Sequence, residues 1–370
     1  MRAVCCSLLQ EEILCATYIG IAGYGTERAA DRDALRFLFL VKGMQREYRI
    51  PGITGGRIQN RLEPGRLYRL TVAGSILWDV KKLERDRIQK KEGLPVTGVP
   101  GKRTLKNFLS LAMEPVGRTL YVFGGGWNWQ DAGSGRLTRR IGMALQWQEF
   151  FLQQDEHYRY RADDDPKHSY YPAQGYNTYG YAGLDCSGYI GWAVYNLMET
   201  RNDRPGYVRR AVQMARDYAV EYGFGTWTGE IPDSSAFRPG DIFSLEGHVW
   251  ICVGRCRDGS LVILHSTPSD SICGCPGGGV QLSGLGRTPD CEGWQLADYY
   301  MKKYFPEWSK RYRAVCKSYD KYVETEGEQT GKFSWQIGRN VLLDPERYRE
   351  KTADEVLTGL FEHSNGCKGK

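Results

Sequence analysis

No apolar run in this sequence is long enough to cross a membrane. The longest one near the start covers residues 13 to 23, well short of the roughly 20 residues that a membrane-spanning helix needs. A secretory signal requires a basic start followed by an uninterrupted apolar core, and Glu11 and Glu12 break the core that would follow Arg2. We therefore expect no membrane span and, for the chain as written, no export signal, which is typical of a cytoplasmic protein.

A strong charge of one sign is also missing. The net charge is +6 over 370 residues, which is far from the basic footprint of a nucleic-acid-binding protein. Such a mild excess of positive charge favours an acidic partner, for example a peptide that carries carboxylates. Aromatic residues and glycine are abundant instead, with 24 Tyr, 10 Trp and 45 Gly. This mixture suits a protein of strands and loops with an aromatic groove, and leaves the oligomeric state open.

The cysteines do not form a disulfide framework. There are 11 of them, and an odd number cannot pair completely within one chain; scattered thiols fit a reducing environment better. The spacing of Cys252, Cys256, Cys273, Cys275 and Cys291 could supply four thiolates to zinc. The first pair, however, lies along or just past a predicted strand, and the second lies in a glycine-rich loop. We interpret all five as ordinary buried or loop thiols, and expect neither a metal nor an organic cofactor.

The first part of the chain reads as β structure. Alternating apolar and polar residues, separated by short turns, predict strands at 34–41, 46–50, 66–72 and 75–80. Short strands joined by tight turns are typical of a small barrel or curled sheet. Residues 84–103 are polar and rich in glycine and proline, so we place a linker there. The predicted N-terminal domain with its linker covers residues 1–100.

The second part has helices first and strands afterwards, which predicts an α+β domain. Residues 277 to 279, three glycines, are interpreted as a turn. We assign residues 101–320 to this domain, with an insertion at about 130–180, and residues 321–370 to a C-terminal extension. The apolar periodicity predicts helices at 104–117, 141–154, 207–223, 294–304 and 352–361, a helix that begins at Cys186, and strands at 241–245, 248–254 and 261–266.

Cys186 stands where a nucleophile is expected. At a helix start, unpaired backbone N–H groups and the helix dipole stabilise a thiolate and can donate to the oxyanion of a tetrahedral intermediate. Only five histidines are available as a base. His248 begins one predicted strand and His265 ends the next, so pairing of the two strands would bring their rings together. Structural histidines are the alternative interpretation, but the pair behind a helix-start cysteine favours catalysis.

Four sequence blocks, in this order, resemble those of the NlpC/P60 cysteine peptidases. They are TLYVFGGG (119–126), LDCSGYIGWAVYN (184–196), RPGDIFSLEGHVWICVG (238–254) and VILHS (262–266). The order differs from that of the permuted relatives, in which histidine precedes cysteine. The β-rich first part resembles the SH3-like barrels that often precede this papain-like domain. Two departures are a gap of 65 positions between Tyr121 and Cys186, and Phe123 where the family often has tryptophan.

The resemblance implies the roles of six residues. Cys186 would be the nucleophile, His248 the general base and acid, and His265 the residue that orients it. Tyr121 would line the site and help to bind the oxyanion or a substrate amine. The remaining two, Asp185 and Ser187, would contact the free amino end of the substrate, although both types are also favoured as helix caps.

The resemblance also implies a substrate and a location. The substrate would be a bacterial cell-wall peptide, derived from peptidoglycan and cut between γ-D-glutamate and a diamino acid. The location would be the cell envelope or the medium. Two other functions stay open: an amidase or acyltransferase that uses the same triad on another amide or thioester, and a catalytically silent module that binds the cell wall. The complete Cys–His–His set argues against the silent module.

Overall fold

The computed structural model describes residues 2–4, 13–18, 35–41, 67–72, 96–127, 140–161, 182–200, 204–338 and 340–362, with backbone alone in the first four ranges and in 140–146. It divides into two compact units, Met1–Gly93 and Leu94–Lys370, and the division falls within the linker predicted at 84–103. Among these residues, no helix is both apolar and long enough to cross a membrane.

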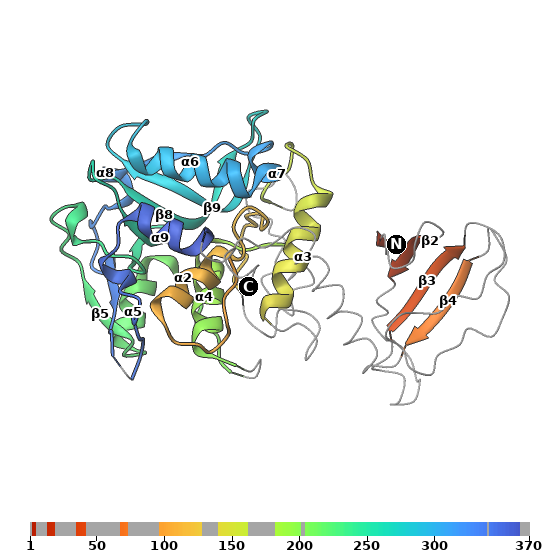
Figure 1. The fold of residues 1–370 in the computed structure, drawn as a ribbon, viewed down its shortest axis with the longest axis horizontal. Coiled ribbons are helices and arrows are strands. Elements are labelled where there is room, and N and C mark those ends of the chain that lie inside the picture. The colour runs from red at the N-terminus through yellow and green to blue at the C-terminus, as the bar shows by residue number, and fades with distance from the viewer. Residues whose placement is uncertain are drawn as a thin grey trace, which may run out of the picture. The chain divides into compact units, whose positions relative to one another are not determined.

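The first unit contains a four-stranded antiparallel sheet with the strand order β1-β2-β3-β4 (Figure 1). Two of these strands match predicted ones, and the predicted strands at 46–50 and 75–80 lie outside the described residues. The strands are β1 (Arg2–Val4), β2 (Ile13–Tyr18), β3 (Leu35–Val41) and β4 (Leu67–Val72).

The second unit mixes helices with a seven-stranded sheet of order β10-β9-β8-β7-β6-β11-β5. Neighbouring strands are antiparallel except β10 and β9. The strands are β5 (Gly225–Thr228), β6 (Ile242–Leu245), β7 (His248–Arg255), β8 (Leu261–Asp270), β9 (Pro276–Gly286), β10 (Cys316–Ser318) and β11 (Gly331–Trp335).

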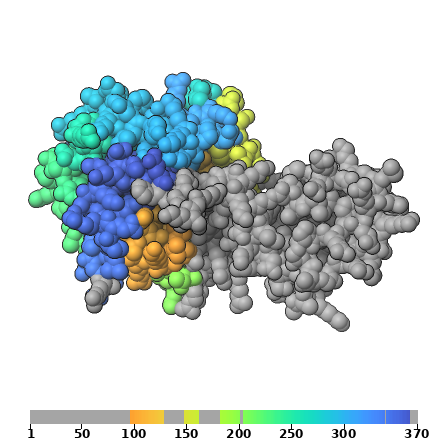
Figure 2. Space-filling view, viewed as in Figure 1, coloured from red at the N-terminus to blue at the C-terminus, as the bar shows by residue number. Residues whose placement is uncertain are grey.

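Helices pack on this sheet, and α6 runs alongside β9 (Figure 1). On the face seen in Figure 2, the light blue atoms of α6 and the dark blue atoms of α9 lie at the surface. The helices are α2 (Leu105–Met113), α3 (Arg140–Gln153), α4 (Cys186–Met198), α5 (Met214–Val220), α6 (Glu292–Tyr304), α7 (Pro306–Ser309), α8 (Tyr319–Tyr322) and α9 (Ala353–Phe361), with 3₁₀ turns at Ala211–Gln213, Ser234–Ala236 and Tyr348–Glu350.

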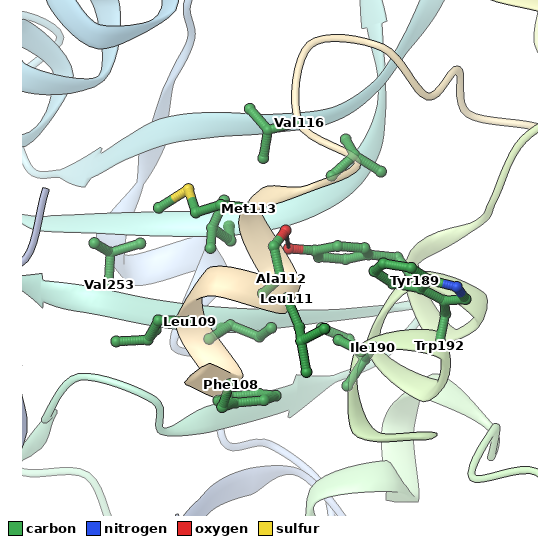
Figure 3. Packing of buried hydrophobic residues seen from close by; sticks show 14 of the residues in the cluster. Phe108, Leu109, Leu111, Ala112, Met113, Val116, Tyr189, Ile190, Trp192 and Val253 are labelled. Atoms are coloured by element: carbon green, nitrogen blue, oxygen red, sulfur yellow. Dashed lines mark hydrogen bonds between the residues drawn. The ribbon is translucent and has the colours of Figure 1, made fainter. Parts of the chain in front are cut away.

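The main core joins α2 and α4 to one face of the sheet. Figure 3 shows Leu111 of α2 next to Ile190 of α4, with Phe108 one turn away and Val253 of β7 on the other side of α2, toward Met113. All of these side chains are buried, and burial of each contributes roughly 1.5–3 kcal/mol. The Tyr189 hydroxyl donates to the carbonyl of Ala112 at 2.7 Å, so a polar group inside this core is satisfied. The start of α4 is therefore held rigidly against the sheet.

Three sequence predictions need correction. The helix predicted at 207–223 is shortened to a 3₁₀ turn and α5. Val208 has no regular secondary structure, and it packs so closely on Gly191 of α4 that a Cβ on that glycine would lie 2.4 Å from a Val208 methyl. Residues 277–279 lie in β9 rather than in a turn. Part of the predicted C-terminal extension forms β11, which pairs with β6 and β5 inside the sheet.

Close packing explains why β9 has glycine at position 279. A Cβ on Gly279 would lie 2.1 Å from the carbonyl oxygen of Thr119, and the segment that contains Leu120 forms a bridge with Gly279. Only a strand without a side chain at this position lets the backbone before Tyr121 approach the sheet. The segment before Tyr121 therefore lies against the first residues of β9.

Candidate active site

Cys186 is the first residue of α4, as predicted, and Asp185 caps the helix. The Asp185 carboxylate accepts hydrogen bonds from the Gly188 N–H at 2.6 Å and from the Ser187 hydroxyl at 2.9 Å. Burial nevertheless raises the pKa of this carboxyl above its usual value. The capping role proposed for Asp185 is therefore present in the structure, and it uses the hydroxyl of Ser187 as a second donor.

Backbone pairing closes the gap of 65 positions between Tyr121 and Cys186. Leu120 bridges Gly183 in parallel, and the Leu184 N–H donates to the Leu120 carbonyl at 3.1 Å. The Asp185 N–H then donates to the carbonyl of Gly125 at 3.0 Å. The insertion between these blocks thus leaves both of its ends side by side.

The backbone of the block at 119–126 is in direct contact with the start of α4. A Cβ on Gly188 would lie 2.0 Å from the Gly125 carbonyl oxygen and 3.0 Å from the Gly126 Cα. These are backbone atoms that cannot rotate away, so the helix start requires glycine there. The motif that follows the cysteine is consequently a packing requirement as well as a sequence signature.

We expect Gly188→Ala to lower the free energy of unfolding by about 2 kcal/mol or more, because overpacking outweighs the gain of about 1 kcal/mol from the higher helix propensity of alanine. Urea denaturation measures the change. Gly338→Ala is the control, since a Cβ there meets no atom within 4 Å, and it should change stability by less than about 0.5 kcal/mol. Equal stability of the two variants would contradict the packing of the blocks.

Tyr121 lies near Cys186. Its ring is half-buried and makes an edge-to-face contact with Tyr160, with the centroids 5.6 Å apart. Burial raises the pKa of Tyr121 well above its usual value, and the nearby groups Cys186 and Asp185 raise it further. The phenol therefore keeps its proton and is available as a hydrogen-bond donor next to the thiol.

The two predicted histidines meet across β7 and β8. These strands pair in the register Ile251↔Leu264, and the His248 Nε2 lies 3.0 Å from the His265 Nδ1. The approach predicted from the strand pattern is therefore present. One of the two nitrogens must carry the hydrogen, so the tautomers of the two rings are coupled.

A chain of polar groups behind His265 is consistent with His248 as the donor in the hydrogen bond between the two rings. The indole of Trp308, which can only donate, gives its N–H to the Gln281 Oε1 at 3.3 Å, and the Gln281 Nε2 donates to the Ser283 Oγ at 3.3 Å. The His265 Nε2 lies 2.9 Å from the same oxygen, which has a second lone pair for it. With the Nε2–H of His265 donated there, its Nδ1 accepts from His248, whose own Nδ1 is left unprotonated as a base.

The thiol lies at the turn between β6 and β7. Its Sγ is 3.9 Å from the Gly247 carbonyl, and a hydrogen bond from the Val249 backbone lowers its pKa. These two residues flank His248 in the chain. Within the part of the chain that the structure describes, no hydrogen bond joins the Cys186 thiol directly to the His248 ring.

The expected stabilisation of a thiolate by the helix start is outweighed. Only 6% of Cys186 is exposed, and burial, followed by the charge of Asp185, raises the pKa of the thiol to about 12. Burial also lowers the pKa of His248 to about 3, with a smaller contribution from Lys317, and lowers that of His265 well below its usual value. The site at neutral pH therefore holds a neutral thiol and two neutral imidazoles.

This burial predicts a pH dependence of stability. Between about pH 3 and 6.5 the unfolded chain protonates His248 while the folded chain does not, so stability falls as the pH drops through this window. We expect His248→Gln to reduce the slope of the free energy of unfolding against pH by up to about 1.4 kcal/mol per unit. Urea titrations at several pH values measure it, and identical slopes in both proteins would contradict a neutral ring in the folded chain.

Sequence reasoning missed Tyr322 and Lys317, as it missed the polar chain of Trp308, Gln281 and Ser283. The ring of Tyr322 in α8 lies 5.3 Å from that of His248 and 6.0 Å from that of His265, and the Lys317 ammonium lies 5.5 Å from the Tyr322 ring. Both residues lie later in the chain than the four sequence blocks, and neither belongs to a recognisable motif. Tyr322 covers the histidine pair from a segment that was expected to begin the C-terminal extension.

The five cysteines considered as a zinc site do not come together. Cys252 is fully buried in β7, while Cys256 and Cys291 are buried near one another. The other two, Cys273 and Cys275, lie in the turn between β8 and β9. The interpretation of Cys252 as a buried thiol thus agrees with the structure, and the spacing in sequence did not predict proximity.

Comparisons of this chain with protein-family models, with curated proteins and with solved structures found no match. The geometry of the described residues therefore carries the functional argument.

Proposed function

We propose that this protein is a papain-like cysteine peptidase of the NlpC/P60 type that hydrolyses peptides of the bacterial cell wall. The observation that carries the proposal is the arrangement of Cys186 at a helix start, beside the two neighbours of His248, with His248 in turn 3.0 Å from His265. Nucleophile, base and orienting group are the three parts that thiol catalysis requires. The antiparallel sheet of Met1–Gly93 would correspond to the SH3-like barrel that often precedes this domain.

The neutral site is consistent with proton transfer during attack. As the Cys186 sulfur bonds to the carbonyl carbon, its proton passes to the Nδ1 of His248, and the carbonyl oxygen becomes an oxyanion. The proton then goes to the leaving amine when the C–N bond breaks, which leaves a thioacyl-enzyme. Water then attacks the thioester and gives a proton to His248, which returns it to the departing Cys186 sulfur, so that the acid and the free thiol are released. The hydroxyl of Tyr121 and the backbone N–H of Cys186 are candidate donors to the oxyanion.

Cationic groups near the site suit an acidic substrate. Arg161 lies close enough to Tyr121 to lower its pKa and stacks over Phe123 at 4.4 Å. Its Nη1 is buried and has no hydrogen-bond partner among the residues that the structure describes. A guanidinium with an unused donor is a favourable partner for a carboxylate, such as the free α-carboxylate of a γ-linked glutamate. We propose γ-D-glutamyl–diamino acid peptides as the substrate on this basis and on the family resemblance.

The test is to incubate the purified full-length chain with L-Ala-γ-D-Glu-meso-diaminopimelate and with the corresponding lysine peptide, and to identify products by mass spectrometry. We expect release of the diamino acid and L-Ala-D-Glu. The α-linked isomer L-Ala-α-D-Glu-diaminopimelate is the matched control and should stay intact. Cleavage of neither γ-linked peptide would overturn the assignment of substrate and favour an amidase or acyltransferase with the same triad.

A further inference from the structure

A second group of chemically reactive side chains lies outside the proposed active site. His157, in the turn after α3, has its Nδ1 3.6 Å from the Sγ of Cys273 and 3.6 Å from the Sγ of Cys275. All three potential ligand atoms lie within 4.8 Å of one another. The two cysteines belong to the turn between β8 and β9, more than 110 positions further along the chain.

The spacing of these atoms matches a tetrahedral zinc site. With a Zn–N distance of about 2.0 Å and a Zn–S distance of about 2.3 Å, tetrahedral angles place a nitrogen and a sulfur ligand about 3.5 Å apart. Both observed nitrogen-to-sulfur distances are 3.6 Å. An ion could therefore enter between the three atoms with only small side-chain movements.

The turn that carries the thiols is already shaped by its own hydrogen bonds. The Ser271 N–H donates to the Cys275 carbonyl at 2.8 Å, and the Gly274 N–H donates to the Ser271 carbonyl at 2.9 Å. The Ser271 Oγ lies 2.8 Å from the Cys273 Sγ and accepts from the Cys275 N–H at 3.2 Å. Gly274 has φ +86°, which glycine adopts without strain. The two sulfurs are thus presented on one side of a preformed turn.

We propose that His157, Cys273 and Cys275 bind one zinc ion, with a fourth position open to water or another ligand. Two thiolates and an imidazole are a donor set that selects zinc over magnesium or calcium, which prefer oxygen ligands. Binding replaces the two thiol protons, so two protons are released for each ion taken up by the fully protonated site. The proposal does not depend on the peptidase function.

A second cluster, of Cys256, Asp258 and Glu292, does not support a metal in the same way. The Glu292 carboxylate accepts from the backbone N–H groups of Arg257 and Asp258, and the Asp258 carboxylate accepts from those of Ser260 and Glu292. Both oxygens of Asp258 and one oxygen of Glu292 therefore already have backbone partners.

A zinc ion would connect the end of α3 to the β8–β9 turn. The residue after His157 is Tyr158, whose hydroxyl donates to the carbonyl of Tyr121 at 2.8 Å. Fixing His157 would therefore also hold Tyr158 and the backbone of Tyr121 in place. The Cys273 thiol at present donates to the carbonyl of Glu156 at 2.9 Å, a contact that the metal would replace.

The test is a zinc titration of the full-length chain, kept reduced with a phosphine and freed of metal with a chelator, by isothermal calorimetry. We expect one ion per chain. Cys273→Ser and Cys275→Ser should each weaken binding on the order of 100-fold, and His157→Ala at least 10-fold. Repeating the titration in buffers of different ionisation enthalpy counts the protons released, which should be more for the wild type than for either serine variant.

Cys316→Ser is the matched control, since Cys316 is partly exposed and its backbone pairs with Gly284 near the other end of β9, roughly 25 Å away. It should bind zinc as the wild type does. Cobalt(II) added in place of zinc gives an independent readout, because thiolate ligands produce sulfur-to-metal charge-transfer absorption that the serine variants should lose in part. Absence of binding, or equal binding by the wild type and the three ligand variants, would overturn the proposal.

Discussion

Cys186→Ala is expected to remove the cleavage of γ-D-glutamyl peptides, with kcat/KM lowered on the order of 10⁴-fold or more. The sulfur is the only proposed atom that forms a bond to the substrate, and alanine leaves the neighbouring histidines and the helix start in place. Because Cys186 is 6% exposed, the variant also creates a small buried space. Its fold is therefore to be checked by circular dichroism, while product formation is followed by chromatography.

Cys256→Ala provides the matched control for the loss of a buried thiol. Cys256 is 5% exposed and lies at the far end of β7 from His248, so the variant should cleave as the wild type does. Trapping adds a second readout, since a slow thioester substrate should acylate the wild type at Cys186 alone. Activity of Cys186→Ala within tenfold of the wild type would falsify the role of the thiol as nucleophile.

His265→Ala is expected to lower kcat on the order of 10²- to 10³-fold and to change KM little, because the loss affects the base rather than the binding of substrate. The His248 Nε2 then loses the partner that lies 3.0 Å away, and its ring is free to rotate or to change tautomer. The measurement is steady-state kinetics with the γ-linked peptide. Ser283→Ala, one step further from the thiol, should have a smaller effect on kcat.

His265→Asn separates orientation from mere packing. Its Oδ1 can take the place of the imidazole Nδ1 as an acceptor for His248, so we expect it to recover about tenfold of the activity lost in the alanine variant. A purely structural role for His265 predicts that both variants lose stability and activity in parallel. Equal kcat values for the alanine and asparagine variants at equal stability would contradict the orienting role.

Local patterns were sufficient for most helices and central strands. Alternation of apolar residues predicted β6, β7 and β8, and the run after Cys186 predicted α4, because each of these elements buries one face or nearly all of its surface. The pattern failed where a distant contact outweighed it. The backbone around Val208 is not helical, and it packs on Gly191. β9 is a strand despite its glycines because β8 supplies a continuous ladder.

For the candidate site too, some features could be predicted from the sequence and others could not. Scarcity of histidine and the strand periodicity were enough to pair His248 with His265 before any distance was known. The protonation states were not accessible from the chain order. A helix start favours a thiolate, but the burial of Cys186 and the neighbouring Asp185 raise the pKa of the thiol to about 12, and burial depends on which segments cover the site.

The amino-acid sequence by itself predicted the helix that begins at Cys186, the histidine pair, and most of the helices and central strands, because these depend on neighbours within one turn or one strand. Only the tertiary structure decided that Tyr322 covers the histidines and that His157 meets Cys273 and Cys275. Contacts of this kind join segments far apart in the chain, so no spacing in the sequence encodes them. They follow from how helices and turns pack on the sheet once its strand order is set.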